Sequence, residues 1–300
     1  MKLIQISDFK LGRSIQGFYL CKEKHLRQTR SGDLFLDMVF TDSTGTIPGK
    51  LWDLVDKFQN RFKSGDPVAV KGKVTEYNDH LQLTVTQVNQ ATDRQYGKYG
   101  YSQDLLIKKV EEPVDVLWKR LSKLVDTLPN PYKKLTKSIF QTYEHKIKTI
   151  PWSAQYHPQL IRGGYLKHIV TTGEMVVDIS PHYPSLDKSL ALCGMLLHDI
   201  GKIDEINDSF QLNNTEVGRL IGHAVLGRDI VREVASSIDN IPEEILLKLE
   251  HIILSHTGFE DTGAKVEPIC PEALFIHYMD VLYSKMNIML ETMVLHSKSK

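Results

Sequence analysis

The sequence predicts a two-part α+β protein, in which a five-stranded β-barrel precedes an all-α domain. Two observations support this division. Up to about residue 90, side chains of opposite character alternate along the chain, which is the period of β-strands. From residue 104 onward, apolar residues recur at spacings of three and four, which is the period of α-helices. A length of 300 residues suits two domains.

Five strands and one short helix are expected in the first part. We predict the helix at 54–62 and the strands at 15–21, 34–40, 47–52, 68–74 and 81–85. Turn-forming residues separate them at 42–45 and 78–79. A helix between the third and fourth strands is the order of an OB-fold barrel. We therefore predict an OB-fold domain at 1–90 and a polar linker at 91–103.

The alternation also assigns two faces to the barrel strands. Residues predicted to point into the barrel are Leu34, Leu36, Met38, Ile47, Leu51, Val68, Val70 and Val74. Residues predicted to point outward are Phe35, Lys50, Trp52, Lys71 and Lys73. Aromatic rings beside lysines suit the stacking of bases next to a phosphate backbone, so these five are candidate nucleic-acid-binding residues. The alternative is that Trp52 packs on the second domain and the lysines are only solvated.

The second part, 104–300, is predicted to be helical throughout. Val114, Leu117, Leu121 and Leu124 mark a first helix, which Pro129 ends. Further helices are predicted at 132–148, 165–179, 188–198, 214–237, 242–255 and 271–295.

Bulk composition excludes several classes of protein. The formal net charge is zero, so no global field indicates a nucleic acid or membrane partner. Three widely spaced cysteines cannot form a disulfide framework, which fits a reducing compartment. No signal peptide or membrane-spanning run is recognised, and we expect a cytoplasmic protein without membrane contact.

Histidine and aspartate residues of the second part form a candidate metal site within residues 160–285. Each lies on a predicted helix or at a helix end: His168, His198, Asp199, His223, His256 and Asp280. Imidazoles and carboxylates are ligands of divalent transition metals. Asp280 shares an apolar helix face, where a carboxylate is costly unless it is paired or bound to metal. Gly201, after the helix end, is expected to let the adjacent His198 and Asp199 converge.

The segments around these residues resemble the HD superfamily of metal-dependent phosphohydrolases. They are 163–168, 196–202, 221–223, 253–258 and 272–280. With the OB-like domain, nearly the whole chain resembles the YhaM family of 3′→5′ exoribonucleases. The resemblance implies one metal ion held by His168, His198, Asp199 and Asp280. It implies a second ion bridged by Asp199 and held by His223 and His256.

One position departs from the family pattern. Thr257 stands where the family has a second histidine, and threonine is a poor transition-metal ligand. The number of ions, one or two, is therefore left open. His251 is a candidate substitute, but on a continuous helix it lies about 140° around the axis from His256.

The resemblance implies a metal-dependent exonuclease acting on single-stranded RNA, with single-stranded DNA as an alternative substrate. Mn is the expected metal, and Fe, Co, Ni or Zn are alternatives. Asp199 and Lys202 are the predicted catalytic residues, since Asp199 would orient the attacking water and Lys202 would offset phosphate charge. Two other functions stay open: a phosphohydrolase of small or cyclic nucleotides, and a non-catalytic nucleic-acid-binding protein with a decayed HD site. Oligomeric state is not assigned.

Overall fold

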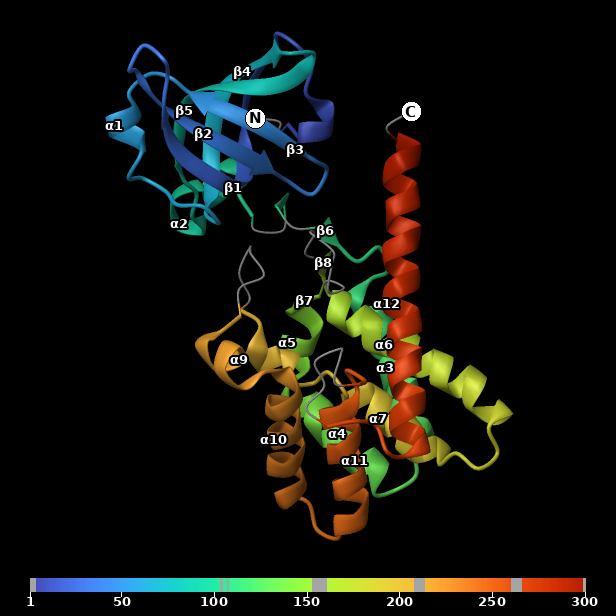
Figure 1. Ribbon diagram of the computed structural model, residues 1–300. Coiled ribbons are helices and arrows are strands. Elements are labelled where there is room, and N and C mark those ends of the chain that lie inside the picture. The colour runs from blue at the N-terminus through green and yellow to red at the C-terminus, as the bar shows by residue number, and fades with distance from the viewer. Residues whose placement is uncertain are drawn as a thin grey trace. The chain divides into compact units, whose positions relative to one another are not determined.

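The computed structural model describes residues 4–102, 105–106, 108–152, 161–207, 214–259 and 266–298. The chain divides into two compact units, residues 1–109 and residues 110–300, and each has its own hydrophobic core. The first unit is a barrel of strands and the second is a bundle of helices (Figure 1).

Five strands close the barrel of the first unit in the order β1-β2-β3-β5-β4. A short 3-10 helix, η1 (Ile6–Asp8), precedes them. The elements are β1 (Ser14–Gln28), β2 (Leu34–Thr41), β3 (Thr46–Leu51), α1 (Val55–Phe58), β4 (Pro67–Tyr77) and β5 (His80–Gln90). The pair β3–β5 is parallel and the other neighbours are antiparallel. The predicted OB-like barrel is therefore confirmed, with the helix between the third and fourth strands.

Seven of the eight residues predicted to face the barrel interior are buried in its core. They are Leu36, Met38, Ile47, Leu51, Val68, Val70 and Val74. The prediction for Leu34 is wrong, because this side chain is 45% exposed. Leu34 pairs with Gln28 at the far end of the β1–β2 hairpin, where residues of β1 are largely exposed. Alternation identified the correct face of the strand, but the hairpin continues beyond the barrel.

Residues 91–103, expected as a linker, contain the short helices α2 (Asp93–Tyr96) and η2 (Gly97–Tyr99). The Thr92 side chain caps α2 by accepting a hydrogen bond from the backbone N–H of Gln95. A two-residue strand, β6 (Lys108–Lys109), follows.

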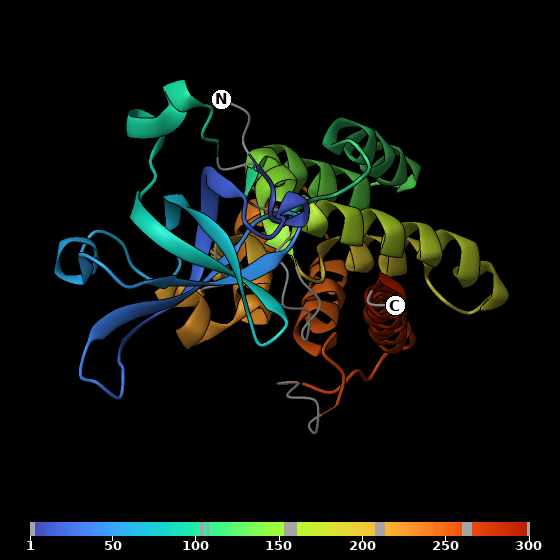
Figure 2. The same cartoon turned by 90° about the horizontal axis from the view of Figure 1, so that it is seen from above.

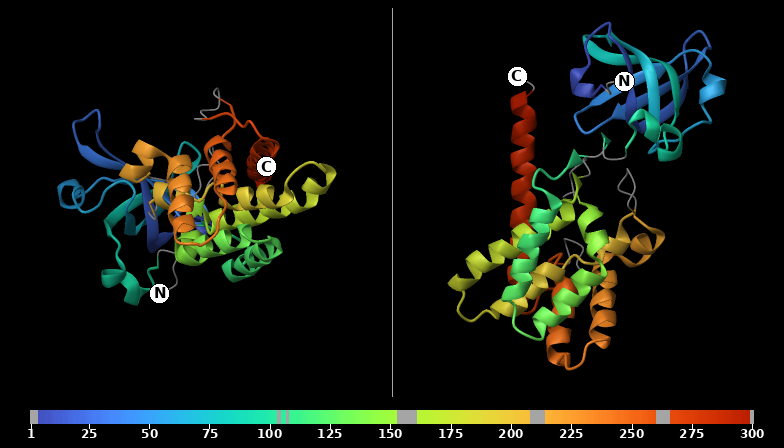
Figure 3. Two further views of the ribbon diagram at one scale, coloured as in Figure 1. Left: turned by 90° about the horizontal axis from the view of Figure 1, so that it is seen from below. Right: turned by 180° about the vertical axis from the view of Figure 1, so that it is seen from behind.

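The second unit is built around the helices α6 (Gly164–Ile179) and α7 (Lys188–Leu197). The helices α3 (Val114–Thr127) and α4 (Tyr132–Thr142) pack on one side of them. On the other side lie α11 (Glu243–Ser255) and α12 (Pro271–Lys298) (Figure 3). Seen from above, α12 is viewed nearly end-on and α6 runs across it (Figure 2). Every residue of α7 from Leu190 to Leu197 is buried, so its C-terminal end lies inside the bundle.

Shorter elements complete this unit. They are α5 (Glu144–Thr149), β7 (Pro151–Trp152), β8 (Ile161–Arg162), η4 (Ser180–His182), α8 (Lys202–Glu205), α9 (Glu216–Ile221) and α10 (His223–Ser236). The strands β7 and β8 pair with each other in antiparallel fashion.

Two predicted helices are each divided in the structure. The helix predicted at 132–148 is α4 followed by α5. The helix predicted at 214–237 is α9 followed by α10, and Gly222 separates them with a φ of 82°. Because a left-handed φ favours glycine, the break occurs at this residue. It makes His223 the first residue of α10.

All three cysteines are free. Burial raises the pKa of the Cys21 and Cys193 thiols to about 12, so both are protonated at neutral pH. Among the described residues, no helix combines the length and apolarity needed to cross a membrane.

Candidate functional site

Two groups of metal-ligand side chains lie next to each other in the helical unit. One consists of His168, His198 and Asp280, and the other of Asp199, His223 and His256. Within each group the potential ligand atoms all lie within 4.8 Å of one another. The structure thus brings together all six residues that the sequence singled out as metal ligands.

Helix ends deliver most of these side chains. His168 lies on α6, and Asp280 lies on α12. His198 and His256 are the C-caps of α7 and α11, and Asp199 follows His198 directly. His223 begins α10, so five helices contribute to one cluster.

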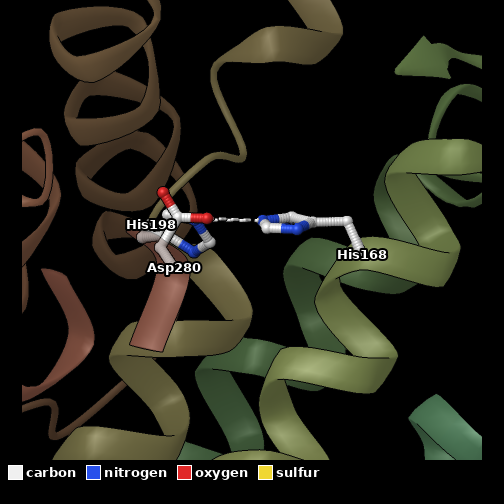
Figure 4. Close-up of side chains that lie close together, drawn as sticks. All are labelled: His168, His198 and Asp280. Carbon is white, nitrogen blue, oxygen red and sulfur yellow. Dashed lines mark hydrogen bonds and ion pairs between the residues drawn. The ribbon is translucent and has the colours of Figure 1, made fainter. Parts of the chain in front are cut away.

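His168 faces His198 and Asp280 in the first group (Figure 4). Its Nε2 lies 3.3 Å from Nε2 of His198 and 3.4 Å from Oδ1 of Asp280. Both rings are completely buried. Burial lowers the pKa of His168 to about 4 and also lowers that of His198. Both imidazoles are therefore neutral at physiological pH, the form that binds a metal.

Asp199 connects the two groups through its two carboxylate oxygens. Its Oδ2 lies 3.5 Å from Nε2 of His198 and 3.8 Å from Nε2 of His168. Its Oδ1 lies 3.3 Å from Nε2 of His256 and 3.5 Å from Nε2 of His223. One carboxylate oxygen therefore faces each group, which is the arrangement of a bridging ligand between two ions.

The orientation of three imidazoles is fixed from the side opposite the cluster. His198 and His256 each use Nδ1 to donate to a backbone carbonyl, of Met195 and Ile253 respectively, at 2.7 Å. These carbonyls belong to the last turns of α7 and α11, where such oxygens lack helical partners. Nδ1 of His223 lies 3.2 Å from Oε1 of Glu205. In the tautomer with the proton on Nδ1, a neutral ring held this way directs its Nε2 lone pair into the cluster.

These lone pairs point toward the carboxylate of Asp199. Oδ1 of Asp199 is buried and has no hydrogen-bond donor among the described residues. Electron pairs that converge on one point without a proton repel each other unless a cation lies between them. The donor set therefore fits divalent metal ions, and the neutral imidazoles and carboxylates suit transition metals.

The carboxylate of Asp199 forms an ion pair with a neighbouring lysine. Nζ of Lys202, the first residue of α8, lies 2.6 Å from Oδ2 of Asp199. Burial raises the pKa of Asp199, but Lys202 and the histidines lower it by more. The pKa of this carboxyl therefore lies well below its usual range. Burial lowers the pKa of Lys202, but Asp199 raises it more, so the net shift is upward. Lys202 is thus positively charged beside the bridging carboxylate.

Protons and metal ions compete for His256. Burial lowers the pKa of this imidazole, but the nearby Asp199 carboxylate raises it more, so the net shift is upward. Metal binding at the second group is therefore expected to weaken as the pH falls.

Two further residues of the site, Glu205 and Tyr165, were not predicted from the sequence. Glu205 accepts hydrogen bonds from the backbone N–H of His223 at 3.2 Å and from its ring. Tyr165 is completely buried, and its hydroxyl has no hydrogen-bond partner among the described residues. Burial raises the pKa of this hydroxyl, and nearby Asp199 raises it further. The sequence held one signal for each residue. Glu205 is an acid three residues after Lys202, and Tyr165 lies one helical turn before His168.

Replacing Glu205 by glutamine is expected to weaken metal binding about 10- to 100-fold. The carboxylate holds His223 in the orientation and tautomer that a metal ligand needs, and removing such partners typically costs this much affinity. Calorimetric titration of the metal-free protein with Mn²⁺ measures the change. Glu233→Gln, on the exposed face of α10, is the matched control. An unchanged affinity in Glu205→Gln would contradict the positioning role.

His251 and Thr257, the two residues considered as further or missing ligands, lie outside the ligand groups. Nε2 of His251 accepts a hydrogen bond from the backbone N–H of Ile269 at 3.1 Å, so this nitrogen serves the fold. Thr257 follows His256 and is half-buried. Neither belongs to the two ligand groups found among the described residues.

The residues predicted to contact nucleic acid are divided over the barrel surface. Phe35 and Trp52 stack with ring centroids 4.5 Å apart. The ammonium group of Lys50 lies 5.6 Å from the Phe35 ring and 5.7 Å from the Trp52 ring. It also lies 5.3 Å from the ring of Tyr77, which the sequence analysis missed. We refer to Phe35, Lys50, Trp52 and Tyr77 as the aromatic cluster. Trp52 is 44% exposed and can present part of its ring to a base. Phe35, predicted as an exposed contact, is instead buried against Trp52 and is only 9% exposed.

Lys73 and Lys71 both lie on β4 but belong to different rows of paired residues. Thr84 of β5 pairs with both Lys50 and Lys73, so these lysines belong to one outward row across three strands. Lys71 pairs with Gln16 and Gln87 in a different row.

Comparison with known proteins agrees with this architecture. Residues 165–284 match the HD domain family, and residues 22–91 match a family described as OB-fold nucleic acid binding domain. Among solved structures, the second OB-fold domain of replication protein A from Methanococcus maripaludis is 21% identical. The similarity covers 30% of this chain and 94% of that one, with a TM-score of 0.25. The mitochondrial single-stranded DNA binding protein Rim1 of S. cerevisiae is 11% identical over 27% of this chain and 95% of that one, with a TM-score of 0.24.

HD domains bind divalent metals and belong to a superfamily of metal-dependent phosphohydrolases, and the two ligand groups lie within the matched segment. The chain therefore combines an OB-fold nucleic acid binding domain with an HD domain of the metal-dependent phosphohydrolase superfamily.

Proposed function

We propose that this protein is a metal-dependent exoribonuclease that hydrolyses single-stranded RNA from its 3′ end, as the YhaM family does. The observation that carries the proposal is Asp199, whose two oxygens face two separate groups of ligands. Two ions held about 3.5–4 Å apart are the usual arrangement for in-line displacement at phosphorus. The 3′→5′ direction and the preference for RNA rest on the resemblance to that family.

The residues of the cluster have separate roles in this proposal. His168, His198, Asp199 and Asp280 would hold one ion, and Asp199, His223 and His256 the other. The bound metal supplies Lewis acidity and lowers the pKa of the attacking water. Asp199 would orient that water, since its carboxylate lies between the groups. Lys202 would offset charge on the non-bridging phosphate oxygens from its place beside Asp199.

The barrel would hold the strand that the helical unit cleaves. The exposed part of Trp52 and the open ring of Tyr77 offer stacking surfaces, and Lys50 lies among them. Stacking tolerates any base, because every base has a π-face. Such a surface suits an enzyme that shortens strands of varied sequence.

Replacing Trp52 by alanine is expected to weaken binding of single-stranded RNA about 5- to 100-fold. A base stacked on an aromatic ring contributes about 1–3 kcal/mol, and 1.4 kcal/mol is a tenfold change in affinity. Fluorescence anisotropy of a labelled oligonucleotide, with EDTA present to stop hydrolysis, measures this change. Tyr183→Ala, an exposed tyrosine of the helical unit, is the control. Equal affinities of Trp52→Ala and the unmodified protein would show that this surface does not bind the RNA.

Degradation of an RNA labelled at its 5′ end, with Mn²⁺ present, tests the proposed activity. A ladder of labelled products that shorten progressively is the expected result. Early release of a labelled mononucleotide would indicate the opposite direction and contradict the proposal. The same assay with DNA of identical sequence compares the two substrates.

The two alternative functions give different results. A phosphohydrolase of small nucleotides would turn over a panel of cyclic and linear nucleotides but leave the oligonucleotide intact. A non-catalytic binding protein would bind RNA, retain no transition metal and hydrolyse neither substrate after Mn²⁺ is added. Either result would overturn the exonuclease assignment.

A further inference from the structure

A groove of about 700 Å³ lies on the barrel unit, and its lining includes no residue of the aromatic cluster. Its walls come from β1, β4, β5 and the segment that contains α2 and η2. Its lining residues include Gln16, Phe18, Lys71, Gln87, Tyr96 and Tyr99. OB-folds commonly bind nucleic acids on the face of strands 2 and 3 and their flanking loops. This groove is built from other strands and is a separate surface.

Two rows of paired residues form the floor of the groove. Lys71 of β4 pairs with Gln16 of β1 and with Gln87 of β5. In the next row, Ala69 pairs with Phe18 and with Asn89. Two amide side chains therefore flank the lysine, and a third, Asn89, lies in the neighbouring row. Amides offer both donors and acceptors, which are the groups needed to hydrogen-bond the edge of a base.

Aromatic rings form one wall of the groove. Phe18 lies edge-on to Tyr96, with ring centroids 5.6 Å apart, and Tyr96 lies 6.3 Å from Tyr99. Tyr99 is 61% exposed, and the ammonium group of Lys98 lies 5.1 Å from its ring. Phe18 and Tyr96 thus support an outer tyrosine whose ring is accessible. This is the arrangement of a stacking platform with a cation beside it.

The charged side chains that line the groove favour an anionic ligand. Its lining residues include two lysines, Lys71 and Lys98, and no carboxylate. A third cation, Arg61, donates to Oδ1 of Asn89 at 2.7 Å. Aromatic rings, amides and lysines together match a nucleotide, which has a π-face, a polar edge and a phosphate.

We propose that this groove is a second binding site for single-stranded nucleic acid. A base stacks on Tyr99, the amides of Gln16 and Gln87 meet the base edge, and Lys71 and Lys98 lie beside the phosphates. The barrel then contacts the strand at two places, the groove and the aromatic cluster. A strand long enough to reach both binds more tightly than one that reaches a single site.

Binding measurements on the full chain in EDTA test the proposal independently of catalysis. We expect Tyr99→Ala to weaken binding of a long labelled oligouridylate about 5- to 100-fold. We expect the double variant Lys71→Ala/Lys98→Ala to reduce the slope of log affinity against log salt by about 1.4, since each single-strand phosphate contact contributes about 0.7. Tyr183→Ala and Lys63→Ala are matched surface controls. Thermal unfolding checks that each variant is folded.

Crosslinking locates the contact directly. An oligonucleotide that carries 5-bromouracil is expected to crosslink to the peptide that contains Tyr96 and Tyr99, and Tyr99→Ala is expected to reduce that product. Unchanged affinity and salt slope, with crosslinks confined to the Trp52 region, would overturn the proposal and leave the groove to another class of ligand. Because hydrolysis is not measured, failure of the exonuclease assignment would not change these results.

Discussion

Replacing Asp199 by alanine is expected to lower RNA hydrolysis by at least about a thousandfold while leaving RNA binding unchanged. The side chain contributes an oxygen to each ligand group and pairs with Lys202. Metal ions contribute several kcal/mol of transition-state stabilisation, and 1.36 kcal/mol corresponds to tenfold in rate. His198→Ala is expected to behave similarly, since its ring lies against both Asp199 and His168.

Three measurements decide this prediction. Rates are compared on the labelled RNA, affinity by anisotropy in EDTA, and metal content by elemental analysis of the purified protein. Asp199→Asn keeps the shape of the side chain and an oxygen that can accept from half-buried Lys202. It therefore separates loss of charge from loss of fold, because removing the partner of Lys202 altogether can itself destabilise the domain. Full activity of any of these variants would contradict the site assignment.

Replacing Gly201 by alanine is expected to disrupt the second ligand group and to destabilise the helical domain. A Cβ atom at Gly201 would collide with the carbonyl oxygen of His223 and the backbone nitrogen of Gly227. Both atoms belong to the backbone of α10, so the helix itself would have to move. Overpacking of this kind commonly costs about 1–3 kcal/mol or more. Moving α10 would also withdraw His223 from Asp199.

Thermal unfolding and metal stoichiometry measure both effects. We expect a lower melting temperature and one bound ion fewer per chain than in the unmodified protein. Gly97→Ala is the matched control, because a Cβ atom there meets nothing within 4 Å. A Gly201→Ala protein with unchanged stability and full metal content would show that α10 tolerates the added methyl group.

Gly201 also shows where sequence reasoning reached the right residue for the wrong reason. The sequence suggested that a glycine lets His198 and Asp199 converge. In the structure its φ is −66°, which other residues adopt readily. The close backbone of α10 is what requires glycine, and that helix begins more than twenty residues later. A pattern along the chain does not report which distant backbone will pack against it.

Most of the helices and the barrel order could be predicted, because periodicity is a local property. The six ligand residues could be found because their segments resemble a known family. The sequence could not show that the two oxygens of Asp199 face two different ligand groups, because this depends on the directions of the side chains. Glu205 was missed for a similar reason, since its partner His223 arrives from another helix. On the barrel, alternation identified outward residues but could not separate Lys50 from Lys71, which lie in different rows.

The distribution of the ligands over α6, α7, α10, α11 and α12 has a consequence for folding. A bound ion joins helices that begin at residue 164 and reach to residue 298, so it acts as a non-covalent staple across most of the domain. Anything that binds only the folded state adds RT ln(1 + [L]/Kd) to its stability. In the proposed arrangement, none of the five helices could detach without removing a ligand from one of the two ions. We therefore expect the stability of the folded domain, as well as its activity, to depend on metal supply.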